Sequence, residues 1–228
     1  VINKTNAIIT CGLEAEWSFE KQFQEYNKNC KILAFDHTVN KKFWAERFLK
    51  DFTAFLLLKK IKPIQIIDVF KFLQYLAFFR GENKHFLKKI VSTKINNNNQ
   101  ITITEAIGEN KDIVLKIDIE GDEYKVLKDV NKNFKKLNLV IIEFHNIKKN
   151  LKKIRSFINQ TKLRNIHINA NNYGQVDNNG MPQVIEMTLI NPKKFKIKNY
   201  KTKRNYPIKG LDFKNHKRGP SIRIIFNK

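Results

Sequence analysis

Acidic residues follow an apolar segment in the middle of this 228-residue chain. Residues 113–117 read Ile-Val-Leu-Lys-Ile, and Asp118, Glu120 and Gly121 come shortly after them. A nearly continuous apolar run predicts a strand buried on both faces of a parallel sheet, and open α/β sheets bind ligands at the carboxyl ends of such strands. Because burying acids without partners is costly, Asp118 and Glu120 are predicted to serve a ligand. The alternative is that Glu120, with Asp122 or Glu123, only begins the next helix, at the positive end of its dipole.

A second pair, Glu143 and His145, stands at the end of another apolar run, Leu137 to Phe144. Residues two apart on a strand point to the same side, so these two side chains are expected to act together. The imidazole of His145 is predicted to be a general base, since histidine ordinarily titrates near neutrality. The alternative is a histidine with a purely structural role.

Gly12 and Asp36 each follow an earlier apolar run, at residues 7–10 and 31–35. A glycine after a strand lets the backbone approach a ligand, and the helix that follows offers free N–H groups to a carboxylate. An acid at the end of the second strand can accept hydrogen bonds from ribose hydroxyls. A helix cap is the alternative for Asp36.

Polar residues later in the chain could hold an acceptor molecule. His167, Asn171 and Asn172 supply an imidazole and amides, which suit a polyhydroxylated molecule, although the asparagines suit a turn equally well. With Glu143 they form the predicted substrate-binding set. The acids and histidines could instead assemble a divalent metal site, but their spacing is not diagnostic and no metal is predicted. The residues of that alternative are Asp118, Glu120, Glu143, His145 and His167.

The pattern of apolar residues predicts strands that alternate with helices. Strands are expected at residues 7–10, 31–35, 113–117, 137–144, 164–168 and 184–190, and helices at residues 17–26, 43–58, 63–79, 85–90 and 151–158. Residues 171–182 contain two glycines and are predicted to form a hairpin loop before the last strand. This order predicts an α/β fold with a mostly parallel sheet and an antiparallel last strand.

Residues 115–127, Leu-Lys-Ile-Asp-Ile-Glu-Gly-Asp-Glu-Tyr-Lys-Val-Leu, resemble the signature of FkbM-type S-adenosylmethionine-dependent methyltransferases. Residues 8–20, 33–36 and 141–145 are similar to other segments of that family and follow in the same order. The resemblance implies a Rossmann-like class I methyltransferase fold, S-adenosylmethionine as cofactor, and O-methyl transfer to a sugar, glycan or small hydroxylated metabolite. The cofactor-binding residues are then Gly12, Glu14, Asp36, Asp118 and Gly121, and Glu14 stands where the family usually has a glycine.

The chain has a formal net charge of +23 at pH 7. Lysine and asparagine are spread throughout residues 1–190, the predicted methyltransferase domain, which favours solvated faces over a dedicated anion-binding surface. Residues 191–228 are predicted to be a basic extension, because eleven basic residues between positions 193 and 218 face a single acid, Asp212. Tyr200, Tyr206 and Phe213 lie among them, a pattern that could serve nucleic acid or acidic glycan. The alternative functions are therefore a catalytically inactive binding module and an RNA methyltransferase.

Composition indicates a globular domain, since hydrophobic residues make up 42% of the chain. Cys11 and Cys30 have no metal-ligand spacing and are expected to be reduced, and no signal peptide is recognisable from Val1 onwards, which together predict a cytoplasmic location. The most apolar region, Ile61 to Phe79, contains Lys62, Asp68 and Lys71, and these charges argue against a membrane span.

Overall fold

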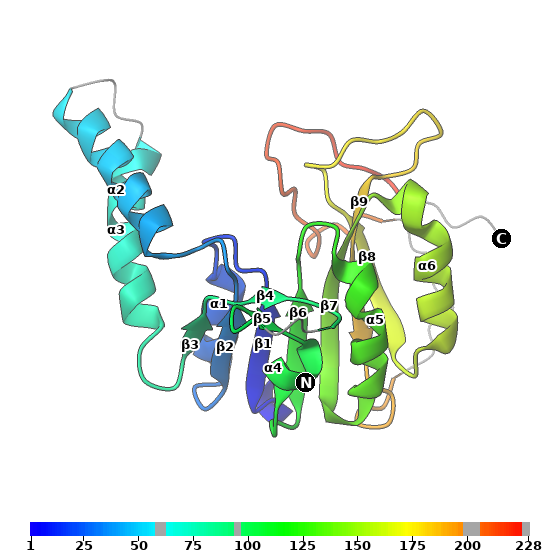
Figure 1. The fold of residues 1–228 in the computed structure, drawn as a ribbon. Coiled ribbons are helices and arrows are strands. Elements are labelled where there is room, and N and C mark those ends of the chain that lie inside the picture. The colour runs from blue at the N-terminus through cyan, green and yellow to red at the C-terminus, as the bar shows by residue number, and fades with distance from the viewer. Residues whose placement is uncertain (58–62, 94–96, 198–205, 225–228) are drawn as a thin grey trace.

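The structure, a computed structural model, describes residues 1–57, 63–93, 97–197 and 206–224 (Figure 1). One sheet dominates the fold. Its strands are β1 (Ala7–Cys11), β2 (Lys31–Phe35), β3 (Lys84–Phe86), β6 (Ile113–Ile117), β7 (Leu137–His145), β8 (Arg164–Ala170) and β9 (Val184–Ile190). Two short strands, β4 (Lys89–Ile90) and β5 (Gln100–Ile101), pair with each other outside it.

The seven strands lie in the order β3-β2-β1-β6-β7-β9-β8. Neighbours are parallel from β3 to β7, whereas β9 runs antiparallel to both β7 and β8. The predicted α/β fold with a mostly parallel sheet and an antiparallel last strand is confirmed.

Six α-helices and two 3₁₀ turns are described. They are α1 (Ser18–Tyr26), α2 (Lys41–Leu56), α3 (Pro63–Phe78), α4 (Ile103–Ile107), α5 (Glu123–Lys132) and α6 (Ile147–Gln160), with η1 (Ile2–Lys4) and η2 (Phe134–Lys136). Figure 1 shows α5 and α6 packed beside β7 and β8, while α2 and α3 extend away from the sheet.

The core forms on both faces of the central strands because β1 and β6 are apolar at successive positions. Ile9 and Leu115 belong to the apolar layer that includes residues of α5 and α6. Ile8 and Val114 face the other way and pack with Phe23 of α1. A strand with apolar residues at successive positions can only be accommodated between two such layers, so the buried carboxyl end of β6 follows from the sequence.

The helix expected at residues 85–90 is wrong. That segment forms β3, which extends the sheet in parallel to β2, and then β4. Tertiary contacts override the helical spacing here: Phe86 stacks on Phe35 with ring centroids 4.9 Å apart, and the imidazole Nε2 of His85 lies 3.1 Å from the carbonyl oxygen of Asp36. The short helix α4 was not predicted, although Thr102 and Glu105 form a capping box at its start.

The described parts of the C-terminal extension, residues 191–197 and 206–224, contain no helix or named strand. Lys194 anchors the start of the extension by donating to Asp112 and Asn138, at 2.9 and 3.0 Å. Further on, Tyr206 and Ile224 form an isolated bridge. The expectation of a packed segment at residues 222–226 can be followed only to Ile224, because residues 225 and 226 lie outside the described residues.

None of the described helices is long and apolar enough to cross a membrane.

Candidate active site

The carboxyl ends of β1, β2 and β6 meet at one edge of the sheet and enclose a cleft. Its walls include Gly12 and Glu14 after β1, Asp36 after β2, and Asp118 and Glu120 after β6. Four of the five residues predicted to bind the cofactor therefore line one cleft. The fifth, Gly121, lies one residue beyond Glu120, where it has a positive φ of 99°.

Gly12 is required by close packing between two strand ends. The amide of Asp118 donates to the carbonyl oxygen of Cys11 at 2.8 Å, which brings the end of β6 against the loop after β1. A Cβ added to Gly12 would lie 1.6 Å from the carbonyl oxygen of Asp118, and its φ of +85° also favours glycine. The glycine thus places the loop after β1 directly against Asp118.

The loop residues beside the cleft carry unusual backbone conformations. Glu14, Ala15, Glu120 and Asn146 are non-glycine residues with positive φ, between 49° and 57°. Such conformations cost free energy and cluster at functional sites, where the surrounding structure holds them in place.

Asp36 holds the loop after β1 through its carboxylate. Oδ2 accepts from the amides of Leu13 and Glu14 at 2.8 and 3.0 Å, and Oδ1 accepts from the amide and hydroxyl of Thr38 at 2.7 and 2.6 Å. Burial acts to raise the pKa of Asp36, but these hydrogen bonds outweigh it and lower the pKa. The predicted ribose contact remains a prediction, since the carboxylate already has four partners in this structure.

Asp118 has the opposite environment. Its Oδ1 is buried and has no hydrogen-bond partner among the described residues. Burial, followed by the nearby charge of Glu143, raises the pKa of Asp118 to about 7, although His145 and Lys116 act to lower it. A carboxylate that titrates near neutrality can exchange protons at physiological pH, which suits a general base.

Glu14 and Glu120 bring two further carboxyl groups to the cleft. A hydrogen bond between these two side chains, then burial and the charge of Asp118, raise the pKa of Glu14 to about 8. Several acids therefore gather here in a chain whose net charge is +23. Such an arrangement favours a cationic ligand.

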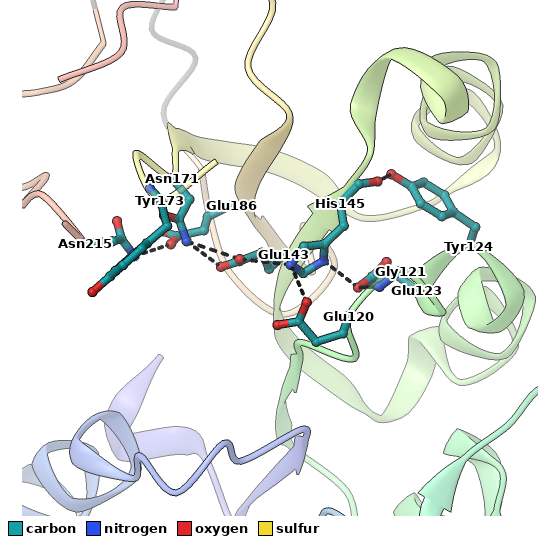
Figure 2. Close-up of polar contacts among 10 residues, drawn as sticks. All are labelled: Glu120, Gly121, Glu123, Tyr124, Glu143, His145, Asn171, Tyr173, Glu186 and Asn215. Atoms are coloured by element: carbon teal, nitrogen blue, oxygen red, sulfur yellow. Dashed lines mark hydrogen bonds and ion pairs between the residues drawn. The ribbon is translucent and has the colours of Figure 1, made fainter. Parts of the chain in front are cut away.

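His145 is held by a fully buried glutamate (Figure 2). Nδ1 of His145 lies 2.8 Å from Oε1 of Glu123, while Nε2 lies 3.3 Å from Glu143 and 3.5 Å from Glu120. Glu123 is 0% exposed, and its Oε1 also accepts from the amide of Gly121. The helix α5 thus begins with a carboxylate that orients the histidine.

Burial lowers the pKa of His145, but the hydrogen bonds to Glu123 and Glu143 and the charges of Glu123 and Glu120 outweigh burial and raise the pKa to about 10. This shift favours the imidazolium form, which donates hydrogen bonds from both ring nitrogens. The role of His145 as general base remains a prediction, and Asp118, whose pKa lies near 7, is the other candidate.

Beyond His145, a polar network crosses the face of β7 and β9 (Figure 2). Asn171 donates to both carboxylate oxygens of Glu143, at 3.2 and 3.3 Å. Glu186, which pairs with Glu143 across the strands, accepts from Asn169 at 3.4 Å and Asn215 at 3.0 Å. The network offers both hydrogen-bond donors and acceptors next to the cleft.

His167 and Asn172 lie further away, against the C-terminal extension. Nε2 of His167 lies 2.7 Å from Oδ1 of Asp212. Asn172 donates to the carbonyl oxygens of His216 and Pro220, at 2.9 and 3.2 Å. Both side chains hold the extension in this structure, so their predicted contact with a substrate remains a prediction.

Sequence reasoning missed Glu123, Glu186 and Asn215. Glu123 was considered only as an acid at the start of a helix, and no sequence signal distinguishes it from a capping residue. Glu186 could have been found, because it lies inside the predicted last strand, where an acid within an apolar pattern is conspicuous. Asn215 is brought to the site only by the path of the extension.

Two sets of side chains could hold a metal ion: Asp118, Glu143 and His145, and Glu14, Asp118 and Glu120, each with ligand atoms within 4.8 Å of one another. Protonated His145 already faces Glu143 and Glu120 and balances their charge without a metal. His167 belongs to neither set because it pairs with Asp212.

The methyltransferase FkbM domain matches residues 61–173. With the α/β sheet, this match defines the protein as an S-adenosylmethionine-dependent methyltransferase. More particularly, its domain is of the FkbM type, and the resemblance seen in the sequence is confirmed across these residues. The family match supports S-adenosylmethionine as the cofactor, as predicted.

Solved structures with a similar fold include a putative RNA methyltransferase from Pyrococcus horikoshii, at 10% identity and a TM-score of 0.42, covering 81% of this chain and 74% of that one. A precorrin-6y C5,15-methyltransferase from Geobacter metallireducens has 9% identity and a TM-score of 0.41, covering 83% and 85%. Fibrillarin from Aeropyrum pernix, in complex with natively bound S-adenosylmethionine, has 8% identity and a TM-score of 0.40, covering 83% and 68%. The chain matches no curated protein. Because these likenesses are weak, the assignment depends on the family match.

The residues of the cleft fit this cofactor. S-adenosylmethionine carries a sulfonium and an ammonium group, and the carboxylates of Asp118 and Glu120 complement positive charge. The unpartnered Oδ1 of Asp118 provides a buried acceptor in the same cleft. Gly12 lets the loop after β1 pack directly against Asp118 at the edge of this cleft.

Proposed function

We propose that the protein transfers a methyl group from S-adenosylmethionine to a hydroxyl oxygen of a sugar, a glycan or another small hydroxylated metabolite. The polar network of Glu143, Asn171, Glu186 and Asn215 beside the cleft supports this proposal most directly. Carboxylates that accept and amides that donate alternate there, which suits a molecule with several hydroxyl groups, each both donor and acceptor.

The cofactor supplies an electrophilic methyl group when bound. Asp118 would accept the proton of the acceptor hydroxyl, which makes the oxygen nucleophilic toward the methyl group that the bound cofactor would supply. The proton would then reside on Asp118 and would balance the positive charge that the cofactor gives up with its methyl group. Alignment of the two reactants supplies much of the acceleration, and a positioned base adds to it.

His145 assists as a cation in this scheme. Glu123 fixes its ring, and Nε2 faces the space between Glu143 and Glu120. An acceptor hydroxyl that lies near this N–H loses its proton more readily, because the imidazolium stabilises the developing negative charge on oxygen.

The acidic character of the cleft argues for an uncharged acceptor. A polyanion such as RNA would bring phosphates close to Glu143, Glu186 and Glu120, whose charges repel them. The basic extension remains the feature that favours nucleic acid as a partner, and its net charge would make such binding strongly dependent on salt. RNA methylation is therefore the second candidate. A cytoplasmic location is supported by two free, buried cysteines, Cys11 and Cys30.

The test is transfer of labelled methyl from S-adenosylmethionine to a panel of neutral glycans, small hydroxylated metabolites and RNA. We expect label on oxygen of a neutral hydroxylated compound, located by mass spectrometry. Glu143→Gln should reduce that transfer, while Glu25→Gln on the exposed face of α1 serves as the matched control. Label found on RNA alone, or on nitrogen of every accepted substrate, would contradict the proposal.

A further inference from the structure

The helices α2 and α3 form an antiparallel pair that is anchored to the domain at one end only. At that end Trp44 is 3% exposed and packs against Trp17, Phe72 and Tyr75, with ring centroids 6.2, 5.8 and 5.0 Å away. Figure 1 shows the rest of the pair extending away from the sheet, with no third element beside it among the described residues. Two amphipathic helices without a third layer cannot bury their apolar side chains.

The projecting part of the pair exposes large apolar side chains on both helices. Leu49 on α2 is 62% exposed and Leu73 on α3 is 58% exposed. The exposed large apolar side chains that the structure describes within the two helices, which we call the hairpin patch, are Phe48, Leu49, Phe52, Phe70, Leu73 and Leu76. Single exposed apolar residues need no explanation, but six on one projecting unit mark an interaction site.

The charge of the same segment favours a negatively charged partner. Residues 41–80 contain nine Lys and Arg against three Asp and Glu, a net charge of +6. Lys50 is exposed beside Leu49, whereas Lys42, near the anchored end of α2, pairs with Glu46 at 3.7 Å. Apolar side chains flanked by lysines on a helix are the features of segments that lie in the interface of an anionic bilayer.

The position of the pair agrees with such a partner. In Figure 1 the far end of α2 and α3 rises on the same side of the molecule as the loop between β8 and β9 and the described part of the basic extension. The carboxyl ends of the parallel strands, which carry the cleft, open toward that side as well. A flat surface that contacted both the α2–α3 pair and the loop between β8 and β9 would lie in front of the active site.

We propose that the α2–α3 hairpin docks the protein on an anionic membrane surface, with the hairpin patch inserted in the interface and the lysines on the lipid headgroups. A second copy of this chain fits the patch less well, because it would bring another charge of +6 against the first. The helices rest on the bilayer and do not cross it, in keeping with the absence of a spanning helix among those described.

The experiment is flotation of the full chain with two kinds of vesicle, phosphatidylcholine alone and phosphatidylcholine with about one-third phosphatidylglycerol. We expect binding to the anionic vesicles only, weakening as salt is raised. Leu49→Gln combined with Leu73→Gln should weaken binding about tenfold or more, because two apolar side chains no longer enter the interface. The matched control is Tyr26→Gln combined with Ile158→Gln, two exposed apolar positions on α1 and α6.

A charge variant keeps the test valid if the leucine variant is unstable. Lys50→Glu should weaken vesicle binding about tenfold, whereas Lys149→Glu on α6 should reduce it only through net charge. Equal effects of the two charge variants would overturn the proposal, as would unchanged binding of the leucine variant. A dimer in sedimentation that Leu49→Gln and Leu73→Gln dissociate, together with no vesicle binding, would show that a second copy covers the patch instead.

Docking does not depend on the proposed chemistry. Vesicle flotation needs neither cofactor nor acceptor, so vesicle binding can be observed while methyl transfer to hydroxyls fails. Methyl transfer can likewise be observed while vesicle binding fails. Thermal stabilisation by S-adenosylmethionine reports whether each variant still has a folded domain.

Discussion

Asp36 and Asp118 occupy equivalent places on either side of β1, yet their surroundings are opposite. Each follows a strand that pairs in parallel with β1, and each reaches the same cleft. Asp36 accepts hydrogen bonds from Leu13, Glu14 and Thr38, and its pKa is lowered. Asp118 has a buried oxygen without a partner among the described residues, and its pKa rises to about 7.

The difference shows that a place at the carboxyl edge of a sheet does not by itself determine what an acid does. Loop amides point at Asp36 and keep it ionised, so it fixes the backbone around the cleft. Glu143 and a buried environment act on Asp118, so it can exchange a proton near neutral pH. One aspartate thus positions the cleft, and the other is available for chemistry.

The largest effect should come from Asp118→Asn. We expect methyl transfer to fall by about a hundredfold or more, since a positioned base contributes that much, and cofactor affinity to fall because a charge facing the sulfonium is lost. Wild-type turnover should rise with pH through about 7, as Asp118 loses its proton. Radiolabel transfer and calorimetry measure these quantities, with Asp129→Asn on α5 as the control. Turnover within about threefold of wild type would assign the base elsewhere.

Asp36→Ala should act mainly on stability. Four hydrogen bonds to a charged group are lost, and we expect the free energy of unfolding to fall by about 2–3 kcal/mol. Denaturant titration measures it, and Asp36→Asn, which keeps an acceptor oxygen, should lose less. If stability were unchanged while cofactor affinity dropped, the ribose contact predicted from the sequence would be its main role.

The contrast between the two aspartates was not visible in the sequence, although their positions were. Apolar runs at residues 31–35 and 113–117 fixed the strands, and an acid at each end followed directly. Strands β2, β6 and β9 have the predicted bounds. What decides the pKa of each acid is the set of groups around it, such as Thr38 and Glu143, and their approach depends on loop conformations that periodicity does not encode.

The wrong helix at residues 85–90 and the raised pKa of His145 both arise from contacts between elements far apart in the sequence. Residues 85–90 carry apolar residues at helical spacing, but pairing with β2 and the stacking of Phe86 on Phe35 turn the first part into an edge strand. His145 was expected to be near neutrality because of its intrinsic pKa. Its partner Glu123 lies 22 positions away in sequence, on another element, and only the fold brings the two together.

The cluster around His145 predicts how stability changes with pH. The pKa of His145 is about 10 in the folded protein, above its ordinary value of 6.5, so its ion pairs stabilise fully below pH 6.5 and this contribution disappears as pH rises through 10. Wild type should lose about 2 kcal/mol of stability relative to His145→Gln over this range, less than the full shift implies because neighbouring acids titrate with it. Denaturant titrations across this range measure the difference.

Two further variants make the histidine test specific. His145→Gln leaves Glu123 buried with only the amide of Gly121 as partner, so the double variant with Glu123→Gln guards against misfolding. His216→Gln, in the extension, should leave the pH dependence as in wild type. A wild-type stability that stays flat between pH 6.5 and 10 would mean that His145 is neutral in the folded protein, and then its role as a base would be restored.

The smallest expected effect is at Glu14, the position where the family usually has a glycine. Its φ of 49° costs a residue with a Cβ about 1 kcal/mol, which glycine avoids. Glu14→Gly should therefore raise the free energy of unfolding by about that amount, while Glu14→Ala removes the carboxyl group and keeps the strain. The two variants should be compared at pH 6, below the pKa of about 8, where Glu14 is protonated and its charge plays no part.

Cofactor affinity should depend on pH at the same position. At pH 6 neither variant should change the affinity much, because Glu14 is uncharged there. Above pH 8 both variants should weaken cofactor binding, since an ionised Glu14 adds to the negative charge around the sulfonium. Equal stabilities of the two variants would show that the loop adjusts its backbone at position 14 without cost. The hydrogen bonds to Asp36 would then not hold position 14 in a strained conformation.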